Sequence, residues 1–554
     1  MIKQLLNTKT KSVSFAALIL AGSYFVSALL ELLRDRLLGG HFGAGNELDV
    51  YYAAFTIPDF IALILIFGAV SAAIIPIFSS YLVSSKEEAW HYVSLILNIF
   101  LTFLICVCIL LIVLAPLLIN LIAPGFSETK KEMTVLLMRI MFLSPIILGT
   151  SSIVSGILQV FHKFLVTALA PIMYNSGIII GILFFVPHFG LSGLAWGVVL
   201  GALMHLLIQI PAFLNSGFTY AKIQSGFKNN FDIGHPGIKK TFILMAPRSL
   251  GLGAGQINTM VITAIASTLA TGSVAVYNLA NNLSFILINA ISISLSTAVF
   301  PAMALAYSKD DTKDFKQKFS GAFSQMLFLC IPISIAIFLL RAQVVRVILG
   351  TGRFSWIDTR LTAACLGVFS LGLCAHGLIL LLAKTFYAAH NTKIPALVSI
   401  GTVAFNIVMS LFFIKMLGFN NFFSDFLRWG LRLEASYNIT VIGLVLAFTI
   451  TAITEALLLL LFINQKLNIF QGTKIAASVC KTLIAGGVMG VVIFLVRDSL
   501  VRYHFVGLQT FWGVFVQLAV SGGFGVICYT VASFLLKSEE LRKLKSLFYG
   551  SRTH

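Results

Sequence analysis

Charged side chains recur inside the long apolar segments of this 554-residue chain. Those within or at the ends of such segments are Arg34, Asp35, Asp49, Asp59, Arg139, Arg248 and Lys384. A charge surrounded by hydrocarbon is costly, so each is expected to face a polar cavity or an ionic partner. Arginine stays charged and offers a planar fork of donors to phosphate or carboxylate oxygens. These residues therefore indicate either a path for an anion or a set of internal ion pairs.

The individual cations leave both interpretations open. Arg34 stands beside Asp35, so it could contact a ligand or form an ion pair with that neighbour. Arg139, Arg248 and Lys384 each lie near the end of a predicted membrane span. At that position, a long side chain is more often one that reaches out to the lipid headgroups than one that lines a path.

Acids and amides are the other candidates. Asp49 and Asp59 flank the break at Thr56-Ile-Pro58, and both could face a cavity. A group of amides follows helical spacing, so that much of one face is polar. Its members are Asn278, Asn281, Asn282 and Asn289, with Gln256 and Asn258 on the preceding segment. This face could hydrogen-bond the polar groups of a ligand or hold neighbouring helices together.

The elements that must position these residues are membrane-spanning helices. Hydrophobic residues make up 58% of the chain and charged residues 10%, which excludes an ordinary soluble protein. Apolar runs of about 20 residues recur, each long enough to cross a hydrocarbon core of roughly 30 Å. About fourteen such runs begin near Val13, Leu48, His91, Met133, Phe164, Ser192, Thr241, Gly272, Ala322, Leu361, Ile394, Asn438, Ile475 and Leu508. The predicted fold is an all-α polytopic membrane protein.

The net charge of +18 is carried mainly by the connectors. Basic residues there do not form a stripe with interleaved aromatic residues, so no nucleic-acid partner is expected. With the N-terminus on the cytoplasmic side, about 21 Lys and Arg residues fall in cytoplasmic segments and about 13 on the other side. This excess predicts that both termini are cytoplasmic. The seven cysteines show no metal-ligand spacing, and no nucleotide-binding or nucleophile motif occurs, so we expect no metal, no cofactor and no enzyme.

A weak internal repeat predicts two lobes. Three matches share an offset of 225 residues: Ser71–Pro76 with Ser296–Pro301, Tyr52 with Tyr277, and Phe161 with Phe386. Six spans per repeat would relate the lobes by an axis along the membrane normal, with a central cavity between them. The predicted organisation is an N-lobe of six spans (1–214), a cytoplasmic linker (215–240), a C-lobe of six spans (241–466), and two further spans with a basic tail (467–554).

The segment from Ser27 to Phe78 carries Arg34-Asp35, the run Phe42–Gly45 and then Asp49. This order resembles the first helical hairpin of the MurJ/MviN family, bacterial flippases for the undecaprenyl-diphosphate precursor called lipid II. The family pattern is close to SRVLG-x-x-RD, FGAG-x-x-x-D and IPN-x-x-RR-x-x-x-EGA-x-S. This chain departs from the family's arginines and glutamate at Ala28, Ala62, Leu63 and Phe67, and at Asn282 in the eighth span.

Further motifs extend the resemblance across the first twelve predicted spans. They are Leu137–Phe142, His235–Lys240, Met245–Leu252, Gln256–Asn258, Gly272–Val274, Gly352–Phe354 and Lys384–Pro395. Their order and spacing, rather than any single motif, are similar to the family. The chain is therefore identified as a divergent member of the MurJ/MviN family, within the multidrug/oligosaccharidyl-lipid/polysaccharide exporter superfamily.

The resemblance implies a lipid II flippase of the bacterial cytoplasmic membrane that works by alternating access. The headgroup would enter the central cavity while the polyprenyl tail stays in lipid, beside the last two spans. A diphosphate needs cations in a low-dielectric path. The residues expected along the headgroup path are Arg34, Asp35, Asp49, Asp59, Asn278, Asn282, Arg248, Lys384 and Arg139. Asp49 would act in gating or coupling.

The sequence leaves alternatives for the driving force of transport and for the transported molecule. Ile262 and Asn391 stand where some relatives bind sodium, so a sodium site is not expected, and the membrane potential remains as a driving force. Fewer arginines would suit another polyprenyl-linked glycan or an amphipathic solute. They would also suit a transport-inactive scaffold for cell-wall synthesis. The expected partners are lipid II or a related lipid, membrane lipids and cell-wall synthesis proteins.

Overall fold

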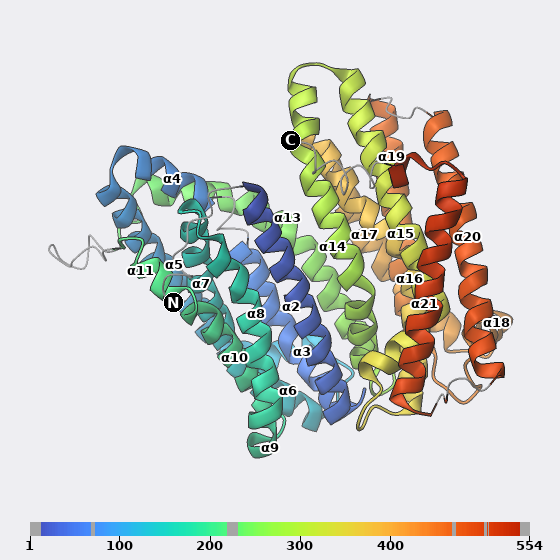
Figure 1. Cartoon of the computed structure of the whole chain (residues 1–554). Helices are drawn as coiled ribbons and strands as arrows, with labels where there is room; N and C mark the ends of the chain where they lie inside the picture. The colour runs from blue at the N-terminus through green and yellow to red at the C-terminus, as the bar shows by residue number, and fades with distance from the viewer. Residues whose placement is uncertain are drawn as a thin grey trace. The chain divides into compact units, whose positions relative to one another are not determined.

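The computed structural model describes residues 13–67, 73–218, 231–467, 472–503, 507 and 509–542. These residues are folded almost entirely into helices, and they include no strand. The chain divides into two compact units, unit 1 (Met1–Ala275) and unit 2 (Val276–His554). Figure 1 shows long helices lying side by side within each unit.

Unit 1 contains α2 (Val13–Phe42), α3 (Asn46–Ile61), η1 (Ala62–Phe67), α4 (Ile75–Ser84), α5 (Lys86–Ile122), α6 (Glu128–Met141), α7 (Leu143–Val160), α8 (Phe164–Ile180), η3 (Gly181–Phe185), α9 (Val186–Phe189), α10 (Ser192–Leu207), α11 (Ile210–Leu214) and α13 (Pro236–Ser267). Unit 2 contains most of α14 (Ser273–Ser308), then α15 (Thr312–Leu349), α16 (Trp356–Ala388), α17 (Lys393–Leu417), α18 (Phe422–Leu431), α19 (Thr440–Leu467), α20 (Gly472–Arg502) and α21 (Phe511–Leu535). The two η elements are π-helical.

The prediction of a polytopic helical protein is confirmed, but a count of fourteen spans is not. Among the described residues, 11 helical segments are long and apolar enough to cross a membrane. The expected spans that begin near Val13, Leu48 and Thr241 coincide with α2, α3 and α13. Each of these elements contains or adjoins residues whose side chains lie outside the described part of the chain, so the count there is incomplete.

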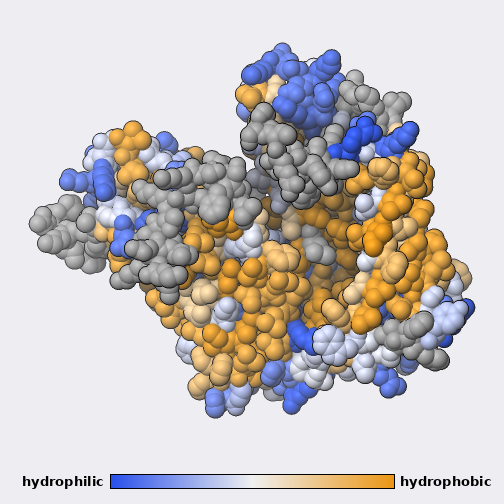
Figure 2. All heavy atoms as spheres, in the orientation of Figure 1, coloured by the Kyte–Doolittle hydropathy of each residue, from blue (hydrophilic) through white to orange (hydrophobic). Residues whose placement is uncertain are grey.

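The outward faces of the helices are apolar. Leu117, Leu121, Phe534 and Leu535 are each between 68% and 73% exposed. Figure 2 shows apolar side chains spread over the helices of both units, with hydrophilic residues gathered near the helix ends. Exposure of this much apolar surface is unfavourable in water but suits a hydrocarbon environment. The chain is therefore a multi-pass membrane protein.

Glycines bring α8 and the adjoining η3 into backbone contact with α10. A Cβ atom on Gly177 would lie 2.3 Å from the Cα of Gly201, and one on Gly181 would lie 2.3 Å from the Cα of Gly197. Lipid supplies no hydrophobic force between helices, so membrane helices associate through such close approaches of small residues. A larger residue at either contact would push the two helices apart.

In unit 2, α20 and α21 pack against α15. Phe328 and Leu340 of α15 form one buried cluster with Met489 and Ile493 of α20 and Tyr529 of α21. The Tyr529 hydroxyl donates a hydrogen bond of 2.7 Å to the Phe328 carbonyl oxygen, which satisfies the polar end of that ring. A continuous core therefore attaches the last two helices to the rest of the unit.

Similar connectors recur in the two halves of the sequence. His162 after α7 and His390 after α16 adopt positive φ angles of 57° and 55°. In both places the amide of the next residue donates to a carbonyl five residues earlier, at 2.9 Å. This pairing closes the end of a helix with a left-handed residue. The two histidines are about 228 residues apart, close to the offset of the sequence repeat.

The lobe boundaries stay a prediction. The division of compact units at Ala275 groups α13 with unit 1, whereas the repeat assigned residues 241–466 to a C-lobe. Residues 219–230 of the predicted linker and residues 543–554 of the basic tail lie outside the described residues. The central cavity expected between the lobes also stays a prediction.

Candidate functional site

Arg34 lies on α2 and is held by three other side chains of unit 1. Its Nε and Nη2 atoms donate to Asp35 Oδ1 at 3.1 and 2.9 Å, and Nη2 lies 3.4 Å from Glu31 Oε1. Its Nη1 atom donates to Asn175 Oδ1 of α8 at 3.2 Å. The Arg34 side chain is 15% exposed and that of Asp35 is fully buried. The ion pair between Arg34 and Asp35, one of the two interpretations from the sequence, is therefore present.

Two carboxylates meet Arg34 in this polar cluster. Glu31 and Asp35 both face the single guanidinium. Asn175 continues the cluster, since its Nδ2 atom donates to Ser27 Oγ at 3.2 Å and so links α8 to α2. A guanidinium has five N–H donors. A phosphate that approached Arg34 would have to compete with the two carboxylates for them.

Asp49 closes a junction between three elements. Its Oδ2 atom accepts hydrogen bonds from Lys130 Nζ at 3.1 Å and from the Gly272 amide at 2.8 Å, while Oδ1 accepts from the Ala275 amide at 3.0 Å. The carboxylate thus stands at the N-terminus of α14, where the first amides lack intrahelical acceptors and a negative charge is favourable. Its side chain is only 3% exposed. Asp49 ties together α3, α6 and the start of α14.

Gly272 allows this junction to form. Its φ angle is +87°, and a Cβ atom there would lie 2.0 Å from the Ala44 carbonyl oxygen. The runs Phe42–Gly45 and Gly272–Val274, which both contribute to the family resemblance, therefore meet in space. At these positions a close backbone approach accounts for the glycine, because any side chain would collide with the neighbouring loop.

Asp59 lies on an exposed face of α3 and pairs with α13. Gln256 donates from Nε2 to Asp59 Oδ2 at 2.8 Å, so two candidates far apart in the sequence are brought together. The π-helical η1 follows directly. It begins with Ala62 and Leu63 and ends at Phe67. These are the positions at which the family pattern has paired arginines and a glutamate.

The amides of α14 share one side of the helix, as their spacing predicts. Leu279 and Leu283, which alternate with them, are buried. The half-exposed residues are Asn278, Asn281, Asn282 and Asn289. The polar side of α14 is therefore distinct from the side that packs into unit 2.

The remaining cations are spread over separate elements. Lys384 of α16 donates to Thr297 Oγ1 of α14 at 2.6 Å. Arg139 is exposed in the last turn of α6, and its Nε atom donates to the Ile112 carbonyl oxygen at 3.2 Å. Arg248 belongs to α13, but its side chain lies outside the described part of the structure. Of the predicted residues, Arg34 and Asp35 are in contact, whereas the other described charged residues bind different partners.

The isolated histidines have structural surroundings. His205 lies 2.7 Å from Ser151 Oγ through its Nδ1 atom, within a network that includes Gln209. The ring of His376 packs against Phe285 at a centroid distance of 4.4 Å. At the position discussed for sodium, Asn391 Oδ1 accepts from the Ile394 amide at 3.2 Å near the start of α17. These side chains support local packing and helix ends.

Comparison with known proteins decides the family. A family model described as "Lipid II flippase MurJ" matches residues 39–515. The chain belongs to the MurJ family. The probable lipid II flippase MurJ of Buchnera aphidicola subsp. Acyrthosiphon pisum (strain APS) is 30% identical over 394 residues, which cover 70% of this chain and 76% of that protein. The lipid II flippase MurJ of Burkholderia cenocepacia (strain J2315) is 24% identical over 408 residues, covering 73% and 78%.

Solved structures show the same fold. A structure titled "Lipid II flippase MurJ, inward closed conformation" superposes with a TM-score of 0.71 at 24% identity, covering 97% of this chain and 100% of the other. An inward-facing multidrug transporter of the MATE family, in the MOP superfamily, gives 0.64 at 15% identity, covering 80% and 94%. As a member of the MurJ family, the chain is a membrane transporter rather than an enzyme.

Sequence reasoning missed several partners of the candidate residues in this MurJ-family protein. Glu31 precedes Arg34 by three residues, a spacing that places both on one helix face, so this pair was available from the sequence. Asn175 and Lys130 come from α8 and α6, and no local pattern links them to Arg34 or Asp49. Sequence reasoning also did not group five arginines of unit 2 that line one pocket but come from separate elements: Arg341, Arg346, Arg360, Arg432 and Arg497.

Proposed function

We propose that this chain is a lipid II flippase that moves the undecaprenyl-diphosphate-linked peptidoglycan precursor across the membrane by alternating access. The family match over residues 39–515 carries the proposal. The apolar outward faces of the helices, the polar side of α14 and the exposed Asp59 of α3 support it, because such a transporter needs lipid contact outside and hydrogen-bonding groups along its path.

On this proposal, the headgroup path uses polar residues of both units. In unit 1 the path includes Arg34, Asp35 and Asp59, with Arg139 and Arg248 as further cations. In unit 2, Asn278 and Asn282 would hydrogen-bond the sugars or peptide, and Lys384 would meet the diphosphate. Asp49 would couple movements of α3 to the start of α14, because its carboxylate binds both. Arg34 would bind phosphate only when a carboxylate partner moves away.

The proposed setting is the bacterial cytoplasmic membrane, with both termini on the cytoplasmic side. The excess of basic residues in the connectors assigned to that side supports this orientation. Lipid II would be the transported partner, surrounded by membrane lipids. Proteins of cell-wall synthesis are further candidate partners.

Complementation tests the proposal. The chain would be expressed in a bacterium depleted of its own lipid II flippase, and growth and the lipid II accessible on the outer face would be measured. We expect rescue by the native chain, loss of rescue with Arg34→Ala and partial retention with Arg34→Lys. Arg353→Gln is the matched control, because Arg353 is an exposed arginine of a connector. Failure of a well-inserted native chain to expose lipid II would contradict the proposal.

A second candidate function is transport of a less anionic cargo, such as another polyprenyl-linked glycan, or a scaffold role without transport. The observation that favours it is the charge balance at Arg34, where two carboxylates face one guanidinium. Normal insertion without lipid II exposure, together with outward appearance of another polyprenyl-linked glycan, would support the first form. Rescue of cell shape without any lipid exposure would support the scaffold.

A further inference from the structure

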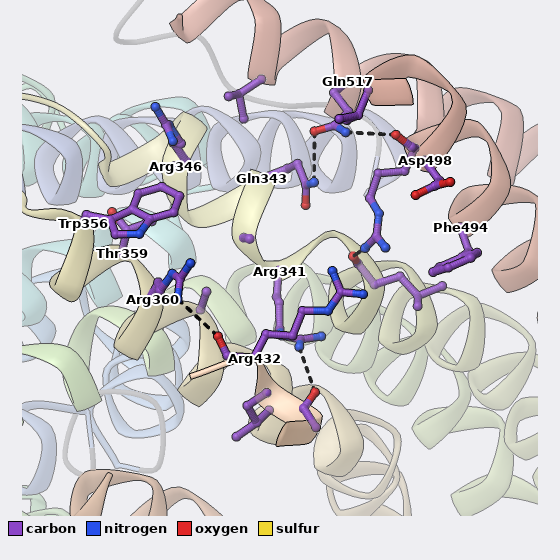
Figure 3. Close-up of a pocket in the computed structure, with 18 residues that line it drawn as sticks. Arg341, Gln343, Arg346, Trp356, Thr359, Arg360, Arg432, Phe494, Asp498 and Gln517 are labelled. Carbon is purple, nitrogen blue, oxygen red and sulfur yellow. Dashed lines mark hydrogen bonds between the residues drawn. The ribbon is translucent and has the colours of Figure 1, made fainter. Parts of the chain in front are cut away.

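Unit 2 contains a pocket of about 540 Å³ whose wall is rich in arginine. The pocket lies where α15, α16, α18, α20 and α21 end or begin (Figure 3). One carboxylate, that of Asp498, also lines it. The five arginines in the wall are Arg341, Arg346, Arg360, Arg432 and Arg497. This excess of positive charge indicates a site for an anion.

Most of these arginines lack an acidic partner. Arg360 forms an ion pair with Glu434 at 3.1 Å, and Asp498 lies 3.4 Å from the exposed Arg502. Among the described residues, none of the other four lining arginines forms a salt bridge with a carboxylate. The charges of Arg341, Arg346 and Arg432 are therefore available to a ligand, in contrast to the charge of Arg34, whereas Arg497 also interacts with the neighbouring Asp498.

The guanidinium groups are held in place by backbone carbonyls and aromatic rings. Arg341 donates to the Phe338 carbonyl oxygen at 2.8 Å, and Arg497 donates to the Leu339 carbonyl oxygen at 2.8 Å. Arg346 lies over the ring of Trp356 with its Cζ atom 5.0 Å from the centroid. Such contacts orient a guanidinium without neutralising it. The site is thus preorganised.

The pocket also places like charges together. Arg341 is close enough to Arg432 and Arg497 for their charges to repel one another. Gln343 and Gln517 lie beside one another in the pocket (Figure 3), joined by a hydrogen bond of 3.0 Å. The Gln343 Oε1 atom is buried and has no hydrogen-bond partner among the described residues. A compact anion would offset the clustered positive charge. A hydroxyl group on the same ligand would donate a hydrogen bond to Gln343 Oε1.

The surroundings indicate the boundary between membrane and water. Four candidate membrane spans end at the pocket: Thr312–Leu349, Trp356–Ala388, Ile475–Arg502 and Phe511–Leu535. The adjoining α18 exposes Phe422 and Trp429, which are 88% and 79% accessible. Aromatic side chains of this kind settle among lipid headgroups. Under the predicted topology this boundary is the outer one.

We propose that this arginine pocket binds the diphosphate group of a lipid at the outer side of the membrane, as a second diphosphate site distinct from the path through Arg34. The proposal rests on the proposed function, in which such a lipid arrives at this side. The three clustered arginines favour a diphosphate group over a lipid whose two phosphates are far apart. In a diphosphate the negative charge is concentrated in a region as small as the one that the arginines surround. Apolar wall residues such as Leu339, Phe494 and Val514 suit the beginning of a lipid tail.

Binding to the full-length chain in neutral phosphatidylcholine nanodiscs tests the proposal. The probes are a polyprenyl diphosphate, a phospholipid with two separated phosphates, and inorganic diphosphate, each measured by native mass spectrometry as a dissociation constant. The variants are Arg346→Gln and Arg432→Gln, because neither side chain donates a hydrogen bond within the described structure and the fold should tolerate both. Arg353→Gln is the matched control, since it removes an exposed charge from the connector between α15 and α16, outside the pocket.

We expect each pocket variant to weaken binding of the polyprenyl diphosphate about tenfold, and the control less than about twofold. Tighter binding of the two-phosphate phospholipid, with the same arginine dependence, would assign the pocket to membrane lipid and overturn the proposal. Equal effects of the control and pocket variants would overturn it too. If the chain fails to rescue a flippase-depleted bacterium but this binding pattern holds, the proposed function fails while the diphosphate site stands.

Discussion

The polar cluster of α2 and the arginine pocket of unit 2 use the same side chain in opposite charge environments. Arg34 is 15% exposed and is met by Asp35 and Glu31. The pocket holds five arginines and one lining carboxylate. In the first region the guanidinium is already neutralised, and in the second most of the charge is uncompensated.

An arginine inside a membrane protein therefore does not by itself mark an anion site. What matters is the balance of charge around it, because the energy of a buried guanidinium is set by its nearest partners. The family motif that contains Arg34 also contains its ion-pair partner Asp35. The arginines of the pocket lie outside the motifs that match the family, and together they place more positive charge in one region.

The largest effect is expected for Asp35→Asn. This change removes the fully buried partner of Arg34 and leaves a mostly buried guanidinium with only the longer, partly exposed contact to Glu31 at 3.4 Å, at a cost of about 3 kcal/mol in the free energy of unfolding. Thermal unfolding of the detergent-solubilised chain measures it. Glu31→Gln is the control and should cost less than about 1 kcal/mol, because Glu31 is partly exposed. Equal losses would mean that burial does not distinguish the two carboxylates.

Asp49→Ala should destabilise the chain by about 2–3 kcal/mol, because it leaves the Lys130 ammonium and two backbone amides without their acceptor. Asp49→Asn retains part of the acceptor and should lose about half as much. The same thermal measurement compares the two variants. A neutral effect of Asp49→Ala would show that this carboxylate, unlike Asp35, is not structural.

Glu31→Gln should also leave more of the Arg34 charge uncompensated, as the charges of the pocket arginines are. With one carboxylate removed, affinity for a polyprenyl diphosphate at Arg34 should rise about threefold, within the energy of a partly exposed ion pair. The measurement is best made in the Arg346→Gln, Arg432→Gln background, so that the pocket contributes little. An unchanged affinity would show that Arg34 does not meet the diphosphate.

The smallest stability effect is expected for Arg432→Gly. Arg432 ends α18 with a φ of 57°, a left-handed conformation that glycine adopts without strain. We expect the free energy of unfolding to rise by about 0.5–1 kcal/mol, measured by thermal unfolding. Diphosphate affinity should fall at the same time, which separates stability from binding. Arg432→Ala is the control, since it removes the charge but keeps the strain.

Local chemistry made much of the fold predictable. Long apolar runs identified the helices, and the spacing of Asn278, Asn281 and Asn282 placed them on one side of α14. The pair formed by Arg34 and Asp35 was also among the sequence interpretations. By contrast, the contact of Asp59 with Gln256 joins residues 197 positions apart. No periodicity within α3 or α13 specifies that meeting.

The membrane class, the helical architecture and the resemblance to the MurJ family follow from the sequence alone, because hydropathy and short motifs are properties of neighbouring residues. The set of Glu31, Arg34 and Asp35 is local in the sequence. The approach of Asn175 to Arg34, and the gathering of Arg341, Arg432 and Arg497 from three different helix ends or connectors, depend on the tertiary structure. Electrostatic energy depends on distances in space, and those distances are set by helix packing rather than by position in the chain.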